Sequence, residues 1–60
     1  MPIIHCYMLE GRNHDQKKNF VKDITDATVK NFNVDPDVVE VFLHETPKEH
    51  YGKSGKLASD

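Results

Sequence analysis

Two residues near the start of the chain could take part in proton transfer. Pro2 follows Met1, and Arg12 is the only arginine among eight basic residues. While Met1 is attached, the Pro2 nitrogen is an amide and is not a useful base. We expect Met1 to be removed, because aminopeptidases cleave a methionine that precedes a small residue such as proline. Pro2 then becomes a secondary amine and a candidate general base, although strands also tolerate proline at their first residue for structural reasons alone.

The chemistry of this amine depends on its surroundings. A model α-amino group has a pKa of about 7.7–8.0, and a secondary amine starts higher. Apolar surroundings and a nearby guanidinium disfavour the ammonium form, which brings the pKa toward the working pH that a general base needs. Arg12 could supply the guanidinium and also grip a substrate carboxylate bidentately. The alternative for Arg12 is a solvated surface arginine.

Three segments must position these groups. Residues 2–9 are short, apolar and partly β-branched, which predicts a strand that is apolar on much of both faces. Asn13 and Gln16 form a capping-box pattern ahead of a helical run from residue 14 to about 32, with an apolar stripe along it. Pro36 prevents the helix from continuing. Residues 38–45 have stronger β-propensity and predict a second strand. The stripe comprises Phe20, Val21, Ile24, Ala27 and Thr28.

Strand, helix and strand in this order predict a single βαβ unit of the α/β (α+β) class, with parallel strands. The glycines at 52 and 55 predict a turn or short hairpin within residues 51–56. Sixty residues make at most one domain, spanning 1–60. Two strands cannot cover a helix and also hide their outer face, and the lone Cys6 excludes an internal disulfide. We therefore expect oligomerisation to complete the sheet.

Composition excludes several classes of function. The net charge is −2, which leaves no basic patch for nucleic acid. No apolar run approaches the ~20 residues of a membrane span. One cysteine and no apolar signal segment indicate a reducing, cytoplasmic compartment. The histidines show no recognised ligand spacing, so we expect no metal site. They are His5, His14, His44 and His50.

Several short motifs occur together at characteristic spacing. They are Pro2-Ile3-Ile4, Leu9-Glu10-Gly11-Arg12, Gln16 in the first helical turn, His50-Tyr51-Gly52 and Leu57-Ala58-Ser59. Each motif is weak alone, but together they resemble the 4-oxalocrotonate tautomerase (2-hydroxymuconate tautomerase) family of the tautomerase superfamily. The resemblance covers essentially the whole chain without gaps.

This resemblance implies a homohexamer, built as a trimer of dimers, with sites at subunit boundaries. It also implies cofactor-free proton transfer on a small 2-hydroxydienoate or enol acid. Pro2 matches the general base, and Arg12 matches the arginine that a neighbouring subunit donates to bind a substrate carboxylate. Tyr51 sits where the family places an aromatic residue that makes the pocket apolar. Leu9 matches a position in the pocket wall.

One position departs from the family. Well-known members carry a second arginine in strand two, and Glu40 aligns with it. At ~4 Å and an effective dielectric of about 20, an attraction of roughly 4 kcal/mol toward a second carboxylate becomes a repulsion of similar size. Either Lys30, Lys53 or His44 replaces the arginine, or the substrate lacks the second carboxylate. Alternatively, Glu40 simply faces outward.

Two other functions fit the sequence less well. A non-catalytic oligomeric binding or scaffold protein on the same fold is kept open by Glu40. A ribbon-helix-helix DNA binder has a similar length, but the net charge is negative and only one helix precedes the second strand. A tautomerase with Pro2 as its base is the leading interpretation.

Overall fold

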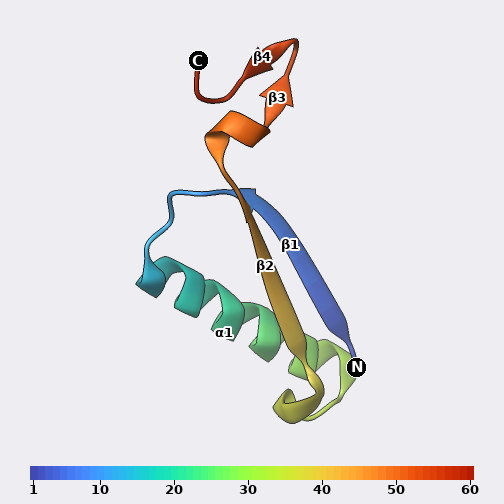
Figure 1. The fold of residues 1–60 in the computed structure, drawn as a ribbon. Helices are drawn as coiled ribbons and strands as arrows, with labels where there is room; N and C mark the ends of the chain where they lie inside the picture. The colour runs from blue at the N-terminus through green and yellow to red at the C-terminus, as the bar shows by residue number, and fades with distance from the viewer.

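The computed structural model describes residues 1–60 and forms the predicted βαβ unit (Figure 1). Strand β1 spans Ile3–Leu9, helix α1 spans His14–Phe32, and strand β2 spans Glu40–Thr46. The two strands pair in parallel, with Ile3 opposite Glu40 at one end and Leu9 opposite Thr46 at the other. The α/β class and the parallel pairing are confirmed. No helix in the chain is both long and apolar enough to cross a membrane.

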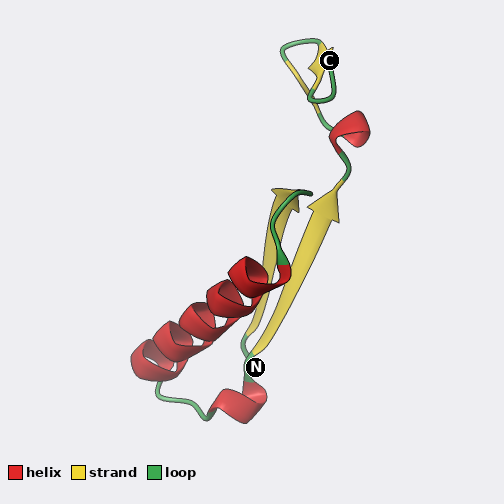
Figure 2. Cartoon of the chain, turned by 90° about the vertical axis from the view of Figure 1, so that its left-hand side faces the viewer, coloured by secondary structure: helices red, strands yellow, loops and turns green.

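Helix α1 covers one face of the two-stranded sheet and leaves the other face open (Figure 2). Ile4, Cys6 and Met8 of β1 are half-buried, as are Val41 and Leu43 of β2, because successive side chains of a strand point to opposite faces. The remaining side chains form what we call the helix-free face. It carries Ile3, His5, Tyr7, Glu40, Phe42 and His44. Within one chain, β1 is therefore covered on one face only.

The chain has no apolar core of its own. Thr28 is its only buried residue, and no hydrophobic side chain is buried. Two members of the predicted helical stripe are exposed: Ala27, and Phe20 with 39% of its surface accessible. Two strands are too narrow a platform to cover the flank of α1 on which these two side chains lie.

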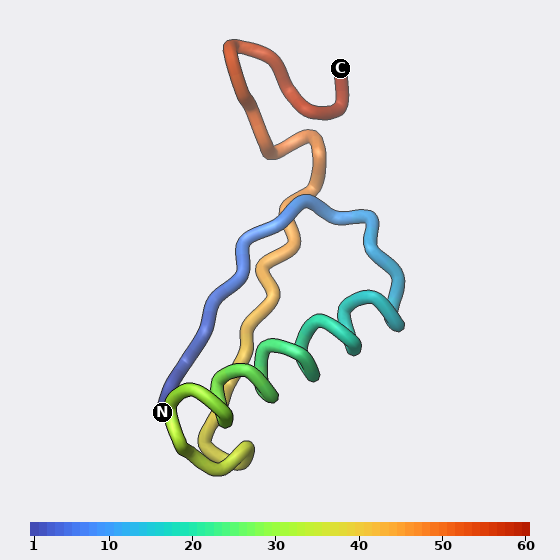
Figure 3. The backbone as a smooth tube through the Cα atoms, turned by 180° about the vertical axis from the view of Figure 1, so that it is seen from behind, coloured from blue at the N-terminus to red at the C-terminus, as the bar shows by residue number.

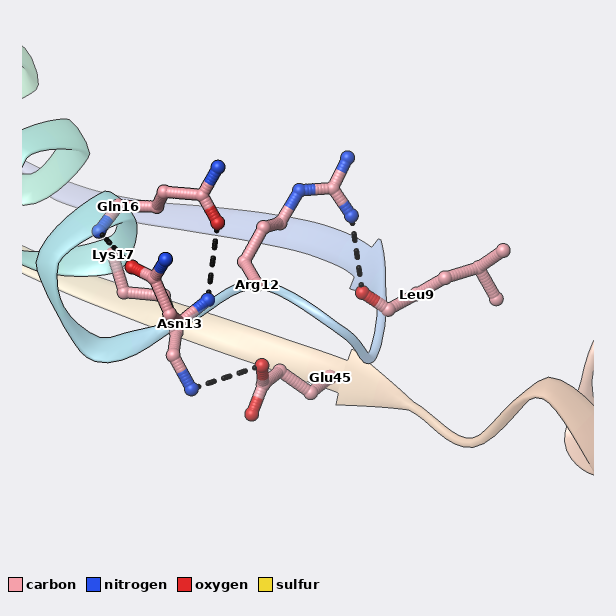
Figure 4. A network of polar contacts seen from close by, with 6 residues as sticks. All are labelled: Leu9, Arg12, Asn13, Gln16, Lys17 and Glu45. Atoms are coloured by element: carbon pink, nitrogen blue, oxygen red, sulfur yellow. Dashed lines mark hydrogen bonds and ion pairs between the residues drawn. The ribbon is translucent and has the colours of Figure 1, made fainter.

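Both ends of α1 are capped by asparagine. The side chain of Asn13 accepts a hydrogen bond from the Gln16 backbone N–H (2.8 Å), and the Gln16 side chain accepts one from the Asn13 N–H (3.0 Å; Figure 4). This confirms the capping box. At the other end, Asn33 has a left-handed backbone (φ 55°) and its N–H donates to the Val29 carbonyl at 3.1 Å. Asparagine tolerates this conformation better than most residues.

The second strand begins later than predicted. Residues Pro36–Val38 form a 3₁₀ turn, η1, rather than the start of a strand. The Val38 N–H donates to the Asp35 carbonyl (3.2 Å) and the Val39 N–H donates to the Pro36 carbonyl (3.1 Å). Proline at the first turn position fixes φ for such a turn and lacks only an N–H that the turn does not use. Local turn geometry therefore outweighs the β-propensity of Val38.

Residues 47–60 form an arm that projects from the end of β2, away from the N-terminus (Figure 3). It contains a 3₁₀ turn, η2 (Lys48–His50), and the antiparallel strands β3 (Gly52–Lys53) and β4 (Lys56–Leu57). Ser54 and Gly55 both have positive φ in the two-residue turn, as type I′ hairpins require. The predicted hairpin is confirmed. Every arm residue is exposed in the single chain.

The capping box provides a direct test of how α1 begins. Replacing Asn13 with alanine removes an acceptor for one of the orphan N–H groups of the helix, so we expect the free energy of unfolding to fall by about 1 kcal/mol. Asn19→Ala is the matched control, because Asn19 is exposed in the middle of α1 and alanine favours a helix. Urea unfolding at one fixed chain concentration measures both variants. Equal stability of the two variants would contradict a working cap.

Candidate active site

Leu9 and Tyr51 line the same cavity, which has a volume of about 300 Å³. Leu9 is the last residue of β1, and Tyr51 follows η2 where the chain leaves β2. Tyr7, Met8 and Thr46 complete a mainly apolar lining. The structure therefore brings together the two residues expected to form the wall of a substrate pocket, at the end of the sheet far from Pro2.

Arg12 lies close to this cavity but borders a different one. Gly11 (φ 129°) turns the chain between β1 and α1, and the Arg12 Nη1 donates to the Leu9 carbonyl at 3.2 Å (Figure 4). A guanidinium has five N–H donors, so four remain for a ligand. The second cavity, also about 300 Å³, lies under the first turns of α1 and shares Met8 with the first. It is lined by Cys6, Met8, Arg12, Gln16, Lys17, Phe20 and Leu43.

Other charges near α1 are paired. The Lys17 ammonium contacts the Glu45 carboxylate at 3.1 Å, which joins α1 to β2 beside Arg12 (Figure 4). Farther along α1, Lys22 donates to Asp26 at 2.8 Å. That hydrogen bond, together with the Asp26 charge, raises the pKa of Lys22. The Arg12 guanidinium, by contrast, donates only to a backbone carbonyl, so its charge has no carboxylate partner within the chain.

Pro2 lies at the opposite end of the sheet from Leu9, Arg12 and Tyr51. Its carbonyl accepts a hydrogen bond from the Glu40 backbone N–H at 3.1 Å, just before β1 begins. Pro2 and Leu9 are seven positions apart along an extended strand, a distance of about 23 Å at 3.3 Å per residue. One chain therefore cannot bring the candidate base to the candidate carboxylate-binding residue.

Glu40 lies at the Pro2 end, opposite Ile3, with its side chain exposed on the helix-free face. His44 shares that face but is four residues farther along β2, about 13 Å away. It is also hydrogen-bonded to His5. Lys53 belongs to the arm at the far end of the sheet. Within one chain, neither His44 nor Lys53 lies beside Glu40 to offset its charge.

Sequence patterns alone did not identify Met8 and Thr46 as cavity residues. Thr46 reaches the cavity because it pairs with Leu9, which only the strand register shows. Met8 lines both cavities, and both it and Leu9 are half-buried where β1 ends. No group of three or more histidine, cysteine, aspartate or glutamate side chains gathers in the chain as metal ligands would.

Comparison with known proteins assigns the fold to a family. The model of a protein family described as tautomerase enzyme matches residues 2–60. The chain belongs to the tautomerase family. A probable tautomerase of Lactiplantibacillus plantarum is 43% identical over 60 residues, which cover all of this chain and 94% of that relative. Members of the family are isomerases, so this chain is an enzyme of that class.

Solved structures agree with this placement. A 4-oxalocrotonate tautomerase isozyme from Methylibium petroleiphilum superposes on this tautomerase with a TM-score of 0.88 and 41% identity, over 97% of this chain and 91% of the other. A heterohexamer 4-oxalocrotonate tautomerase from Chloroflexus aurantiacus has the same TM-score with 27% identity, over 100% of this chain and 97% of the other. The βαβ unit with its short hairpin is thus the tautomerase fold.

Proposed function

We propose that this tautomerase interconverts the enol or dienol form of a small 2-hydroxy acid and its ketone, with the free amine of Pro2 as the general base. The active protein is then a single domain, residues 2–60, from which Met1 has been removed. Neither a cofactor nor a metal takes part in this scheme. The substrate is a small molecule with at least one carboxylate, for which Arg12 is the binding residue.

One observation supports this proposal most strongly. Leu9 and Tyr51 line one apolar cavity, and the Arg12 guanidinium lies next to it without a carboxylate partner. An apolar pocket with a free cation at its edge suits an acid whose carbon skeleton must be kept from water. The base expected to act there lies about 23 Å away in the same chain. A second copy of the chain must therefore supply Pro2 to the pocket.

The proposed reaction is a proton transfer without net change in composition. Arg12 holds the substrate carboxylate through two N–H groups and fixes the position of the acid. The neutral Pro2 amine removes a proton from the hydroxyl or from a carbon of the dienol acid and returns it to another carbon. The walls formed by Leu9 and Tyr51 disfavour the ammonium form of the base between turnovers.

This division of the site favours an oligomer, and we propose a homohexamer. The helix-free face and the exposed arm leave apolar surface that further copies could cover. The hexameric assembly of the Chloroflexus aurantiacus relative supports that number of subunits. In such an assembly, each pocket combines Pro2 of one subunit with Arg12 of another, and each subunit contributes to more than one pocket.

The role of Pro2 as the base and the role of Arg12 as the carboxylate-binding residue can be tested separately. Chemical synthesis provides chains that begin at Pro2 or at Met1. We expect the Met1 form to ketonise phenylenolpyruvate about 100-fold or more slowly, because its Pro2 nitrogen is an amide. Arg12→Ala should lose about 10- to 100-fold in kcat/KM, since hydrogen bonds to charged groups contribute roughly 1.5–3 kcal/mol. Lys22→Ala, which removes a cation elsewhere on α1, should match the wild type. Unchanged turnover of both the Met1 form and Arg12→Ala would refute these roles.

The negative charge of Glu40 leads to a second prediction, which concerns the preference between monoacid and diacid substrates. We expect the wild type to prefer a monoacid, phenylenolpyruvate, over a diacid, 2-hydroxymuconate, because Glu40 repels a second carboxylate. Glu40→Arg should raise the ratio of kcat/KM for diacid to monoacid by about tenfold or more, the equivalent of 1.4 kcal/mol. Glu49→Arg makes the same charge change in the arm and should leave the ratio unaltered. A wild type that clearly favours the diacid would rule out the role of Glu40.

A further inference from the structure

The helix-free face carries a continuous stack of four rings. Tyr7 lies over His44 with ring centroids 4.5 Å apart and an interplanar angle of 13°. His5 stacks on Phe42 (5.1 Å, 13°) and on His44 (5.0 Å, 21°). The rings alternate between β1 and β2, because the parallel register places His5 opposite Phe42 and Tyr7 opposite His44. Tyr7, at one end of this stack, also lines the cavity shared by Leu9 and Tyr51, whereas His5, Phe42 and His44 line neither cavity.

A hydrogen bond joins the two imidazoles at the centre of the stack. The His5 Nδ1 and His44 Nε2 atoms are 2.7 Å apart. One of these nitrogens must carry the hydrogen and the other must offer a lone pair. The hydrogen bond is therefore possible when both imidazoles are neutral, or when only one of them is a positively charged imidazolium. When both rings are protonated, both nitrogens carry hydrogens, and two cations face each other at this distance.

A second copy of this chain is the occupant that best fits the face. Tyr7 is 76% exposed and Phe42 46% exposed, while the chain buries no hydrophobic side chain internally. A two-stranded sheet with one bare aromatic face is not stable alone in water. The divided active site also requires copies to meet along the sheet, and α1 lies on the opposite face (Figure 2). A second copy of the chain also carries the Pro2 that the divided site needs.

We propose that the His5–His44 pair makes self-association through the helix-free face dependent on pH. Side chains of α1 do not reach this face, and its other ionisable groups are Glu40, at the Pro2 end, and the Tyr7 phenol. Carboxylates and phenols ordinarily do not change charge between pH 5 and 8, where unperturbed histidine titrates. The assembled form excludes the second proton from the imidazole pair, whereas separated chains accept it. Association therefore weakens as the pH falls.

Sedimentation equilibrium between pH 7.5 and 5.5 tests this proposal on the whole chain. Below the ordinary histidine pKa of about 6.5, we expect the apparent dissociation constant to rise by about tenfold per pH unit for each proton excluded. His44→Gln keeps a donor and an acceptor but does not titrate, so it should remove most of this dependence. The double variant His14→Gln/His50→Gln should retain it. A wild type equally associated across the range, or an unaltered dependence in His44→Gln, would overturn the proposal.

A second measurement does not depend on altering the pair. In His14→Gln/His50→Gln, only His5 and His44 remain, so their imidazole C2–H proton signals can be followed by NMR against pH. Coupled rings should titrate in two separated steps, and the second should coincide with the loss of the assembled species. Two independent transitions near pH 6.5 without any change in assembly would overturn the proposal even if His44→Gln failed to fold.

Discussion

A helix that lies across two strands leaves half of the strand side chains uncovered, and this constraint governs the whole molecule. Thr28 is the only buried residue, although more than a third of the sequence is hydrophobic. The apolar side chains that α1 does not cover lie on the helix-free face, on the flank of α1 around Phe20, and in the arm. A chain of this size cannot bury them by rearranging itself. The oligomer proposed above would bury this surface against other copies of the chain.

The same geometry separates the chemistry of the site. In a parallel βαβ unit, both strands run in one direction, so the residue before β1 and the residues after it lie at opposite ends of the sheet. Pro2 and Glu40 share one end, while Leu9, Arg12 and Tyr51 share the other. Assembly would thus have two effects. It would cover apolar surface, and it would bring the Pro2 amine of one chain close to the Arg12 guanidinium of another. The apolar surroundings that assembly would create also exclude water, and burial away from water favours the neutral form of the Pro2 amine.

The sequence predicts local features well because short-range interactions decide them. The capping box of Asn13 and Gln16, the length of α1 and the turn at Ser54–Gly55 all follow from neighbouring residues. Features that depend on pairing between distant segments could not be predicted in this way. The contact between His5 and His44 spans 39 positions and requires the strand register. Val38 was misassigned to the second strand because a proline-led turn outweighs its local β-propensity.

The candidate site was predictable to a similar extent. The structure places Leu9, Tyr51 and Arg12 at one end of the unit, but no pattern within one chain shows which copy supplies Pro2. The substitution at position 40 was visible in the sequence, and the structure adds that Glu40 lies at the Pro2 end, where neither His44 nor Lys53 lies beside it to offset its charge.

Subunit mixing tests the central claim, that each pocket combines Pro2 of one chain with Arg12 of another. Pro2→Ala and Arg12→Ala chains would be denatured together, refolded as a mixture and assayed against each variant refolded alone. Random assembly from equal amounts should restore about a quarter of the pockets, each with an intact Pro2 and an intact Arg12 from different chains. Recovery of activity toward that fraction of the wild type is the predicted result. A mixture no more active than its two parents would show that the pocket is not shared between copies.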